Sequence, residues 1–279
     1  MNIANFERCY NLLTQLLLKD AAAFWREMGS RPEGFGELSP EDVLEVLLTH
    51  EVNGRDRRRQ ATLLKTSRVP MFANLSDIST GNGRDEAFHK MILTLSTLDF
   101  IKDGYNLTIF GGTGTGKTYI ASALLRQCCM HGMAGRFFTT QDLIAYLHQS
   151  QGSPQYKVKR QMLQRLAVLV IDDFGLTEYS QSDLGVLYDV LNDRYGKKTT
   201  IVTSQKSPDV WLKDLQHSTL GEAVVERLST NNYTLLLKGS SRRRTLAQIE
   251  QEHAAIVQEL SGEEQKAQEN ATSSAVPVA

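Results

Sequence analysis

The spacing of hydrophobic positions changes near residue 105 of the chain. Before that point apolar residues recur three or four positions apart, most clearly in the runs Phe6–Leu17 and Val43–Leu48, and this spacing predicts helices. After it, short apolar runs alternate with helical patterns, which is typical of strand–helix–strand units around a parallel sheet. The predicted strands are Leu107–Phe110, Arg136–Thr139, Val168–Asp172, Thr199–Thr203 and Tyr233–Leu237. We therefore expect an α/β fold with a five-stranded parallel sheet and a helical N-terminal region.

Local signals set the bounds of two predicted N-terminal helices. Ser39 is the expected N-cap of a helix that has Pro40 at its first position and two carboxylates in its first turn, where they meet the positive end of the helix dipole. This helix is expected to continue into the basic segment Arg55–Arg68. Pro70 interrupts the pattern, and a further amphipathic helix is predicted for Asp85–Phe100.

Composition sets few further limits. The chain has 279 residues, of which 41% are hydrophobic and 23% are charged, an ordinary globular composition. The longest apolar run, Leu166–Ile171, has six residues, far fewer than the roughly 18 that a membrane span needs. The N-terminus has no signal-peptide pattern, and the three cysteines have neither disulfide nor metal-ligand spacing. We expect a cytoplasmic protein without a membrane span.

Charge is unevenly distributed along the chain. The formal net charge is −1, which taken alone argues against a nucleic-acid partner. From Glu250 onward six acidic residues stand against one lysine, so residues 1–249 contain 30 basic and 26 acidic residues, a net charge of +4. An acidic C-terminal segment therefore hides a mildly basic body. Residues 262–279 lack a sustained apolar period, and we expect them to be disordered.

A complete phosphate-binding loop follows the first predicted strand. Residues 111–118 have the sequence GGTGTGKT, which matches G-x-x-x-x-G-K-[ST] between an apolar strand and a helical run. Such a loop turns its backbone N–H groups toward the phosphates, and its lysine reaches the β and γ oxygens. Thr118 is expected to bind Mg²⁺. The expected nucleotide-binding residues here are Gly111, Gly112, Thr113, Gly114, Thr115, Gly116, Lys117, Thr118 and Tyr119.

Two carboxylates follow the most apolar predicted strand. Asp172 and Asp173 come directly after Leu166–Ile171, and open α/β sheets bind ligands at the carboxyl ends of their strands. We expect Asp172 to hold Mg²⁺ and Asp173 to orient or deprotonate the attacking water. The alternative is a solvated acidic turn. Together with the phosphate-binding loop, this pair predicts a nucleotide site that takes ATP and Mg²⁺.

The order of these motifs resembles that of one family. After the loop come Arg136–Thr140, Val168–Gly175, Thr200–Gln205, Glu226–Leu228 and Gly239–Arg242. Over roughly residues 95–245 this order resembles the IstB family of ATP-binding helpers of insertion-sequence transposition, which is similar to the helicase loader DnaC and to the initiator group of AAA+ ATPases. The resemblance implies a helical domain at 1–95 that binds DNA or a partner, an AAA+ ATPase domain at 96–245 without a full C-terminal lid, and a helical to disordered acidic tail at 246–279.

The resemblance also assigns roles to single residues. Gln205 occupies the position of the family's sensor-1 asparagine and Asp173 that of a glutamate, so both departures leave the hydrolysis rate open. Arg227 occupies the position of an arginine finger that acts on the neighbouring subunit's ATP, which implies an ATP-assembled homo-oligomer; a surface arginine paired with a nearby glutamate is the alternative. Arg242 is either a nucleotide-binding sensor-2 arginine or part of a basic patch on DNA. The expected catalytic residues are Lys117, Asp172, Asp173, Gln205 and Arg227.

Two basic segments are candidate DNA contacts. One lies in the helical N-terminal region, and the other lies between the second and third predicted strands, where the resemblance implies a helix lining a DNA channel. Neither segment has interleaved aromatic residues or a base-reading motif, so we expect contact with phosphates without sequence choice. A solvated helix face is the alternative for each. The residues are Arg55, Arg57, Arg58, Arg59, Lys65, Arg68, Lys157, Lys159, Arg160 and Arg165.

These features lead to the hypothesis of an ATPase that binds DNA and assists a transposase. Its subunits would bind ATP and Mg²⁺ between them, assemble on duplex DNA, deform it, and recruit and stimulate the transposase until hydrolysis releases them. A DnaC-like loader of a replicative helicase, with a preference for single strands, is one alternative. A nucleotide-regulated interaction protein that hardly hydrolyses ATP is another.

Overall fold

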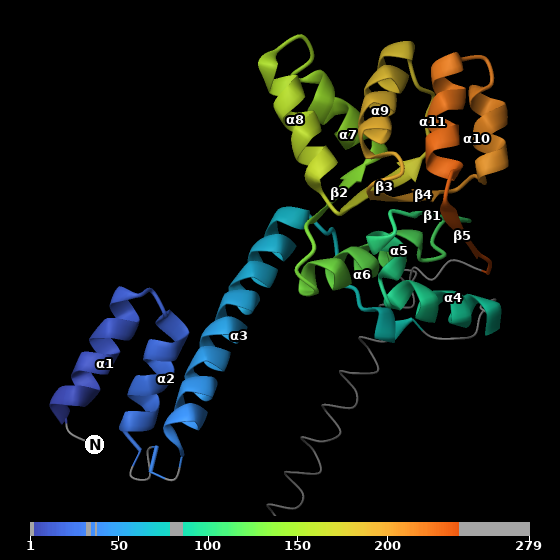
Figure 1. The fold of residues 1–279 in the computed structure, drawn as a ribbon. Coiled ribbons are helices and arrows are strands. Elements are labelled where there is room, and N and C mark those ends of the chain that lie inside the picture. Colours follow the sequence, from blue (N-terminus) through green and yellow to red (C-terminus); the bar gives the residue numbers. More distant parts are fainter. Residues whose placement is uncertain (1–2, 32–34, 37, 79–85, 240–279) are drawn as a thin grey trace, which may run out of the picture.

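The N-terminal part of the structure is helical. The structure, a computed structural model, describes residues 3–31, 35–36, 38–78 and 86–239. The first helices are α1 (Ile3–Gln15), α2 (Lys19–Gly29) and the long α3 (Pro40–Ser67). They pack around a small core that includes Ala21, Trp25 and Leu47, and Figure 1 shows them projecting away from the α/β part.

The predicted start of α3 is confirmed. The Ser39 hydroxyl accepts a hydrogen bond from the Asp42 N–H at 3.1 Å, and the Asp42 carboxylate accepts one from the Ser39 N–H at 3.2 Å. This reciprocal capping box satisfies two backbone donors that would otherwise lack a partner. Pro40 is the first residue of the helix, which continues through the basic segment to Ser67 as expected.

Parallel strands form one sheet in the order β2-β3-β4-β1-β5. Their bounds are β1 Asn106–Gly111, β2 Gly135–Thr139, β3 Val168–Phe174, β4 Thr199–Ser204 and β5 Asn232–Leu237. All five predicted strands are confirmed, and so is the α/β class with a five-stranded parallel sheet. Because β1 lies between β4 and β5, and β3 lies beside β4, the carboxyl ends of β1, β3 and β4 lie side by side at one end of the sheet.

Helices cover both faces of the sheet (Figure 1). One face is covered by α4 (Glu86–Ser96), α5 (Asp99–Lys102) and α6 (Lys117–Met130), with the short turn η1 (Leu75–Asp77) beside them. The other is covered by α7 (Thr140–His148), α8 (Pro154–Arg165), α9 (Gln181–Arg194), α10 (Pro208–Leu215) and α11 (Thr219–Ser229). None of the described helices is long and apolar enough to cross a bilayer.

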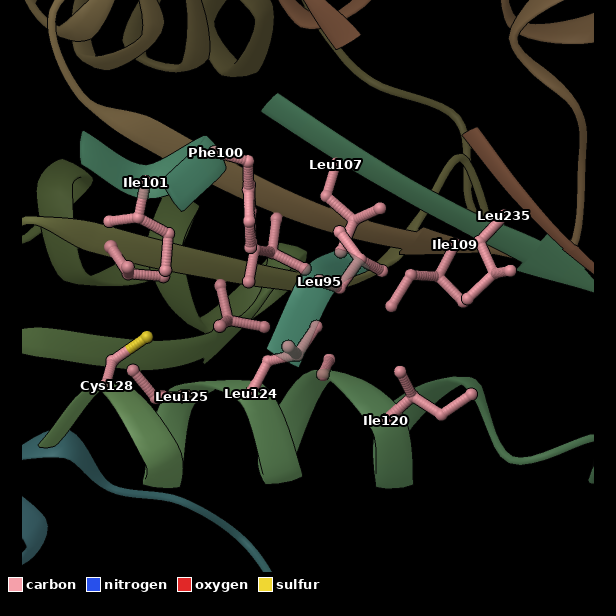
Figure 2. Close-up of a cluster of buried hydrophobic side chains, with 14 of the residues drawn as sticks. Leu95, Phe100, Ile101, Leu107, Ile109, Ile120, Leu124, Leu125, Cys128 and Leu235 are labelled. Atoms are coloured by element: carbon pink, nitrogen blue, oxygen red, sulfur yellow. The ribbon is translucent and has the colours of Figure 1, made fainter. Parts of the chain in front are cut away.

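The buried strand β3 feeds two hydrophobic cores. Val168 and Val170 pack into the core on the α6 side, and Leu169 and Ile171 pack into the core on the α9 side, because successive side chains of a strand alternate between the faces of a sheet. Figure 2 shows the first core, in which α6 lies beneath β1. Each fully buried aliphatic side chain stabilises the fold by about 1.5–3 kcal/mol, so these cores hold the loop and the acidic strand in a fixed relation.

One predicted element differs from the structure. The single helix expected for Asp85–Phe100 consists of α4 and α5, which are separated by a break at Leu98. Leu98 has φ of +61° and is 2% exposed, so the backbone gives up helical geometry there to bury this side chain. The side chains of Phe88 and Ile92 on α4 also belong to the sheet core, while the domain boundary at residue 95 stays a prediction.

Three predictions concern residues outside the described part of the chain. These are the absence of a full lid after β5, the role of Arg242, and the helical to disordered tail at 246–279.

Candidate nucleotide-binding site

The phosphate-binding loop connects β1 to α6. Gly111 has φ of +149°, and a Cβ there would come within 2.3 Å of the Leu237 carbonyl oxygen on β5. Gly116, with φ of +100°, is the N-cap of α6. Both conformations favour glycine. The loop therefore places the N-terminal N–H groups of α6 at the edge of the sheet, where they form an anion site.

Lys117 lies across the loop. Its ammonium group donates hydrogen bonds to the carbonyl oxygens of Gly111 at 2.9 Å and Gly112 at 2.8 Å, and the residue is 6% exposed. The Thr115 hydroxyl also donates to the Gly112 carbonyl, at 2.8 Å. A buried cation is thus held beside the N–H groups of the loop, where a bound phosphate would compensate its charge.

Asp172 and Thr118 form a compact oxygen cluster. The Thr118 hydroxyl lies 3.1 Å from both carboxylate oxygens of Asp172, and the Thr203 hydroxyl donates a hydrogen bond to Oδ1. Burial raises the pKa of Asp172, the charge of Asp173 raises it further, and the hydrogen bonds from Thr203 and Thr118 oppose these effects. Hydroxyl and carboxylate oxygens are the ligands that Mg²⁺ prefers, so these residues fit a magnesium ion that accompanies a nucleotide.

Asp173 adjoins this cluster, and Gln205 adjoins the phosphate-binding loop. Asp173 occupies a bulge of β3 with φ of +56°, a sparsely populated conformation that costs about 1–3 kcal/mol and is frequent at functional sites. Gln205 follows β4, and its side-chain carbonyl accepts a hydrogen bond from the Thr113 hydroxyl of the loop at 3.2 Å. The structure therefore brings the loop, both acidic residues and Gln205 to one edge of the sheet.

Sequence reasoning missed Thr203. Its hydroxyl accepts a hydrogen bond from the Asp173 N–H at 3.1 Å and donates one to the Asp172 carboxylate, and the residue is fully buried. Thr203 thus positions both acidic residues at once. The signal that would have found it is the strand order, because only the pairing of β3 with β4 places this threonine beside the acidic pair.

Tyr119 contacts a segment outside the loop. Its hydroxyl accepts a hydrogen bond from the Asn74 N–H at 3.3 Å and donates one to the Asp77 carboxylate at 3.2 Å. Tyr119 therefore joins the first turn of α6 to η1. Its role in nucleotide binding stays a prediction.

Arg227 lies at the opposite end of the strands from the loop. Its carbonyl oxygen accepts a hydrogen bond from the Asn106 side chain at 2.9 Å, and Asn106 begins β1 whereas the loop begins where β1 ends. Five residues of strand separate these two ends of β1 by about 17 Å. The guanidinium donates to Asn192 at 3.0 Å and to the Tyr188 hydroxyl at 3.2 Å, and Glu226 lies 3.6 Å away. Arg227 is thus too distant for the loop of its own subunit.

The cations of the basic segment at α3 form two groups, those that contact other groups of the protein and those that are exposed without such contacts. Arg55 and Arg58 lie 2.8 Å and 3.7 Å from the buried carboxylate of Glu51, and Arg59 donates to the Gly132 carbonyl at 3.1 Å. Desolvation raises the pKa of Glu51, but the hydrogen bonds from Arg55 and from the backbone of α2 outweigh it and lower the pKa. Arg58, which also pairs with Asp20 on α2, and Arg59 therefore connect α3 to other elements, whereas the Arg55–Glu51 pair lies within α3. Among the described residues of this segment, the exposed cations with neither a carboxylate partner nor such a carbonyl contact are Arg57, Lys65 and Arg68.

The second basic segment, on α8, divides similarly. Arg160 forms ion pairs with Asp189 at 2.8 Å and Asp193 at 2.9 Å on α9, and Lys159 donates to the Tyr146 carbonyl at 2.5 Å. Lys157 and Arg165 are exposed, and neither pairs with a carboxylate among the described residues. The DNA contacts predicted for both segments stay predictions.

The fold and the site together define a class, the P-loop nucleotide-binding proteins of the AAA+ type. The chain belongs to the family of IstB-like ATP-binding proteins, whose family model matches residues 11–249. The predicted resemblance is thereby confirmed, and the protein is an ATP-binding member of this insertion-sequence family.

Individual relatives show the extent of the similarity. The chain is 29% identical to the insertion-sequence protein y4uH of Sinorhizobium fredii over 235 residues, which cover 84% of this chain and 94% of that protein. It is 34% identical to a protein of Pseudomonas fluorescens named for the insertion sequence IS1162 and for ATP binding, over 69% of this chain and 83% of that protein. The crystal structure of DnaI has a similar fold, with a TM-score of 0.50 and 20% identity over 67% of this chain and 100% of that one.

Replacing Thr203 by valine is expected to weaken the Mg²⁺-dependent part of ATP binding. Valine keeps the shape of threonine but removes the hydroxyl that positions Asp172 and Asp173, a loss of about 1–3 kcal/mol. The Mg²⁺ concentration needed for half-maximal binding of an ATP analogue should rise roughly tenfold. Thr203→Ser, which restores the hydroxyl, should return it close to the wild-type value. A valine variant with a lower Tm but an unchanged Mg²⁺ midpoint would show that Thr203 serves the fold alone.

Proposed function

We propose that this protein is an ATP-dependent, DNA-binding helper of a transposase. The observation that carries the proposal is the complete phosphate and metal cluster of Lys117, Thr118 and Asp172 in a chain whose relatives are named for insertion sequences and ATP binding. Such a site supports a nucleotide-controlled activity, and the names of the relatives support transposition as the process it serves.

ATP would bind at the loop with its phosphates against the N-terminus of α6. Lys117 would hold the β and γ phosphates, and Thr118 and Asp172 would hold Mg²⁺, which supplies charge neutralisation on the phosphate oxygens. Asp173, positioned in its bulge by Thr203, would orient or deprotonate the attacking water. Gln205, already joined to the loop through Thr113, would hydrogen-bond the γ-phosphate or that water. We propose ATP hydrolysis as the resulting reaction.

Arg227 would act on the ATP of a neighbouring subunit. Its distance from its own loop supports this, since Arg227 and the loop lie at opposite ends of β1. A site completed by the next subunit makes hydrolysis depend on a homo-oligomer, and ATP would in turn favour assembly because binding effects are reciprocal.

Duplex DNA is the proposed nucleic-acid partner. The exposed cations of α3 and α8 support contact with phosphates, and the electrostatic part of such binding carries no sequence choice. Assembly along the duplex would deform it, recruit the transposase and stimulate integration, and hydrolysis would release the helper.

The test is retention of a labelled duplex by the full chain at about 0.15 M salt. A non-hydrolysable ATP analogue with Mg²⁺ should raise duplex affinity relative to the nucleotide-free protein, and competition with an equal length of single strand should leave the duplex bound. An affinity that does not respond to the analogue would refute the proposal. Nucleotide-dependent binding that prefers single strands would instead favour the helicase-loader alternative.

A further inference from the structure

A cationic cluster lies at the free edge of the sheet, where α3 packs on β2 and α8 lies nearby. We call Arg68, Arg136, Tyr146 and Lys159 the edge cluster. The Lys159 ammonium lies 4.2 Å, and the Arg136 guanidinium 5.3 Å, from the centroid of the Tyr146 ring. Arg136 also lies 4.8 Å from the ring centroid of Phe138. Two cations from different elements thus share one aromatic ring.

The positive charge of this cluster is not balanced within the described residues. No described carboxylate pairs with Arg68, Arg136 or Lys159. The Nε atom of Arg136 is buried without a hydrogen-bond partner, and Nη1 has the Met162 sulfur at 3.8 Å. Burial lowers the pKa of Arg136 and the like charge of Arg68 lowers it further, while the contact with the Tyr146 side chain opposes both effects. A guanidinium has five N–H donors, and the half-buried Arg136 side chain keeps donors besides the buried Nε and its contacts with Met162 and Tyr146.

The edge cluster lies at the end of a row of exposed cations that begins on α3. Arg57 and Lys65 are eight residues apart on α3 and share one side of the helix, and Arg68 follows directly as its C-cap, with φ of +54°. Their eleven-residue span rises about 16 Å along the helix axis, roughly the length of five base pairs of duplex. Arg68 ends this row at the C-terminus of α3, the helix that packs on β2, the strand of Arg136.

We infer that the edge cluster binds nucleic-acid phosphate and joins the basic segments of α3 and α8 into one track along duplex DNA. The inference rests on the proposed function, because it specifies where the DNA contact lies. The Tyr146 ring already carries Lys159, Arg136 and, with ring centroids 5.5 Å apart, Phe138, so it is not an open platform for a base. This arrangement suits backbone contact, whereas single-strand binding without sequence choice relies on exposed stacking surfaces.

The inference is tested with Arg136→Gln in the full chain, by titrating a labelled duplex with protein and a non-hydrolysable ATP analogue at several salt concentrations. One phosphate contact contributes about 0.9 to the slope of log affinity against log salt. We therefore expect about fivefold weaker binding at 0.15 M salt and a slope smaller by about one. Lys213→Gln, which removes an exposed charge on α10, should leave both quantities unchanged.

A second variant guards against a local folding defect in Arg136→Gln. Arg68 is exposed, so Arg68→Gln should lower duplex affinity and slope in the same way while Tm and ATP binding stay at wild-type values. Wild-type affinity and slope in both folded variants would overturn the inference and leave the proposed function standing. A wild-type chain without nucleotide-dependent duplex binding would overturn both.

Discussion

Replacing Lys117 by alanine is expected to weaken ATP binding about 100-fold. The ammonium group that now lies 2.8–2.9 Å from the loop carbonyls is the cation that would hold the β and γ phosphates. Loss of this cation removes two charge-assisted hydrogen bonds to the phosphates, so the free energy of ATP binding becomes less favourable by about 3 kcal/mol. Binding of a fluorescent ATP analogue measures this directly.

The control for Lys117→Ala is Lys102→Ala. Lys102 pairs with Asp99 at 2.7 Å on the exposed surface of α5, so its removal changes the same charge without touching the loop, and ATP affinity should stay at the wild-type value. Exposed pairs of this kind contribute about 1 kcal/mol or less to stability. An affinity of Lys117→Ala within threefold of wild type, in a folded protein, would contradict the assigned site.

Replacing Arg227 by alanine is expected to lower ATP turnover about 10³-fold while ATP affinity stays within threefold of wild type. An arginine finger contributes a factor of 10³–10⁵ to phosphoryl transfer through charge in the transition state. ATP binding in the ground state should not change, because Arg227 lies at the opposite end of the strands from the loop of its own subunit. Steady-state turnover and analogue binding, measured on the same preparation in the presence of duplex, separate the two effects.

Mixing two inactive variants distinguishes a contact between subunits from a structural role. A subunit with Lys117→Ala binds little ATP but keeps Arg227, whereas a subunit with Arg227→Ala binds ATP but lacks the arginine. Mixed oligomers should therefore recover turnover that neither variant has alone. Arg227 also contacts Asn192 and Tyr188 on α9, so Tm is measured in parallel. Unchanged inactivity of the mixture, with both variants folded and assembled, would show that Arg227 does not act in trans.

Features determined by neighbouring residues were predictable from the sequence. The capping box at Ser39 and Asp42 depends on residues three positions apart, and β3 is recognisable because six consecutive apolar residues precede its carboxylates. The loop at 111–118 belongs to the same group, since Lys117 bonds the carbonyl groups of its own backbone segment. In each case the physical cause lies within one turn or one strand.

Features determined by strand order and packing were not predictable. Thr203 contacts the acidic pair only because β4 lies beside β3, and no spacing in the sequence encodes that neighbour. Nothing in the sequence of the basic segments at α3 and α8 indicates that folding brings Tyr146 of α7 and Arg136 of β2 to Lys159. The break at Leu98 likewise follows from burial of its side chain, which overrides a continuous helical pattern.

The most direct test of the central claim is a reconstituted integration assay with the cognate transposase. Donor ends, target plasmid and transposase are combined with the wild-type chain, with Lys117→Ala, or with neither, in the presence and absence of ATP and Mg²⁺. We predict that integration into the target requires the wild-type chain together with ATP and falls to the level of transposase alone with Lys117→Ala. Integration that proceeds equally without the chain, or equally without ATP, would contradict the claim that this ATP site controls assistance to a transposase.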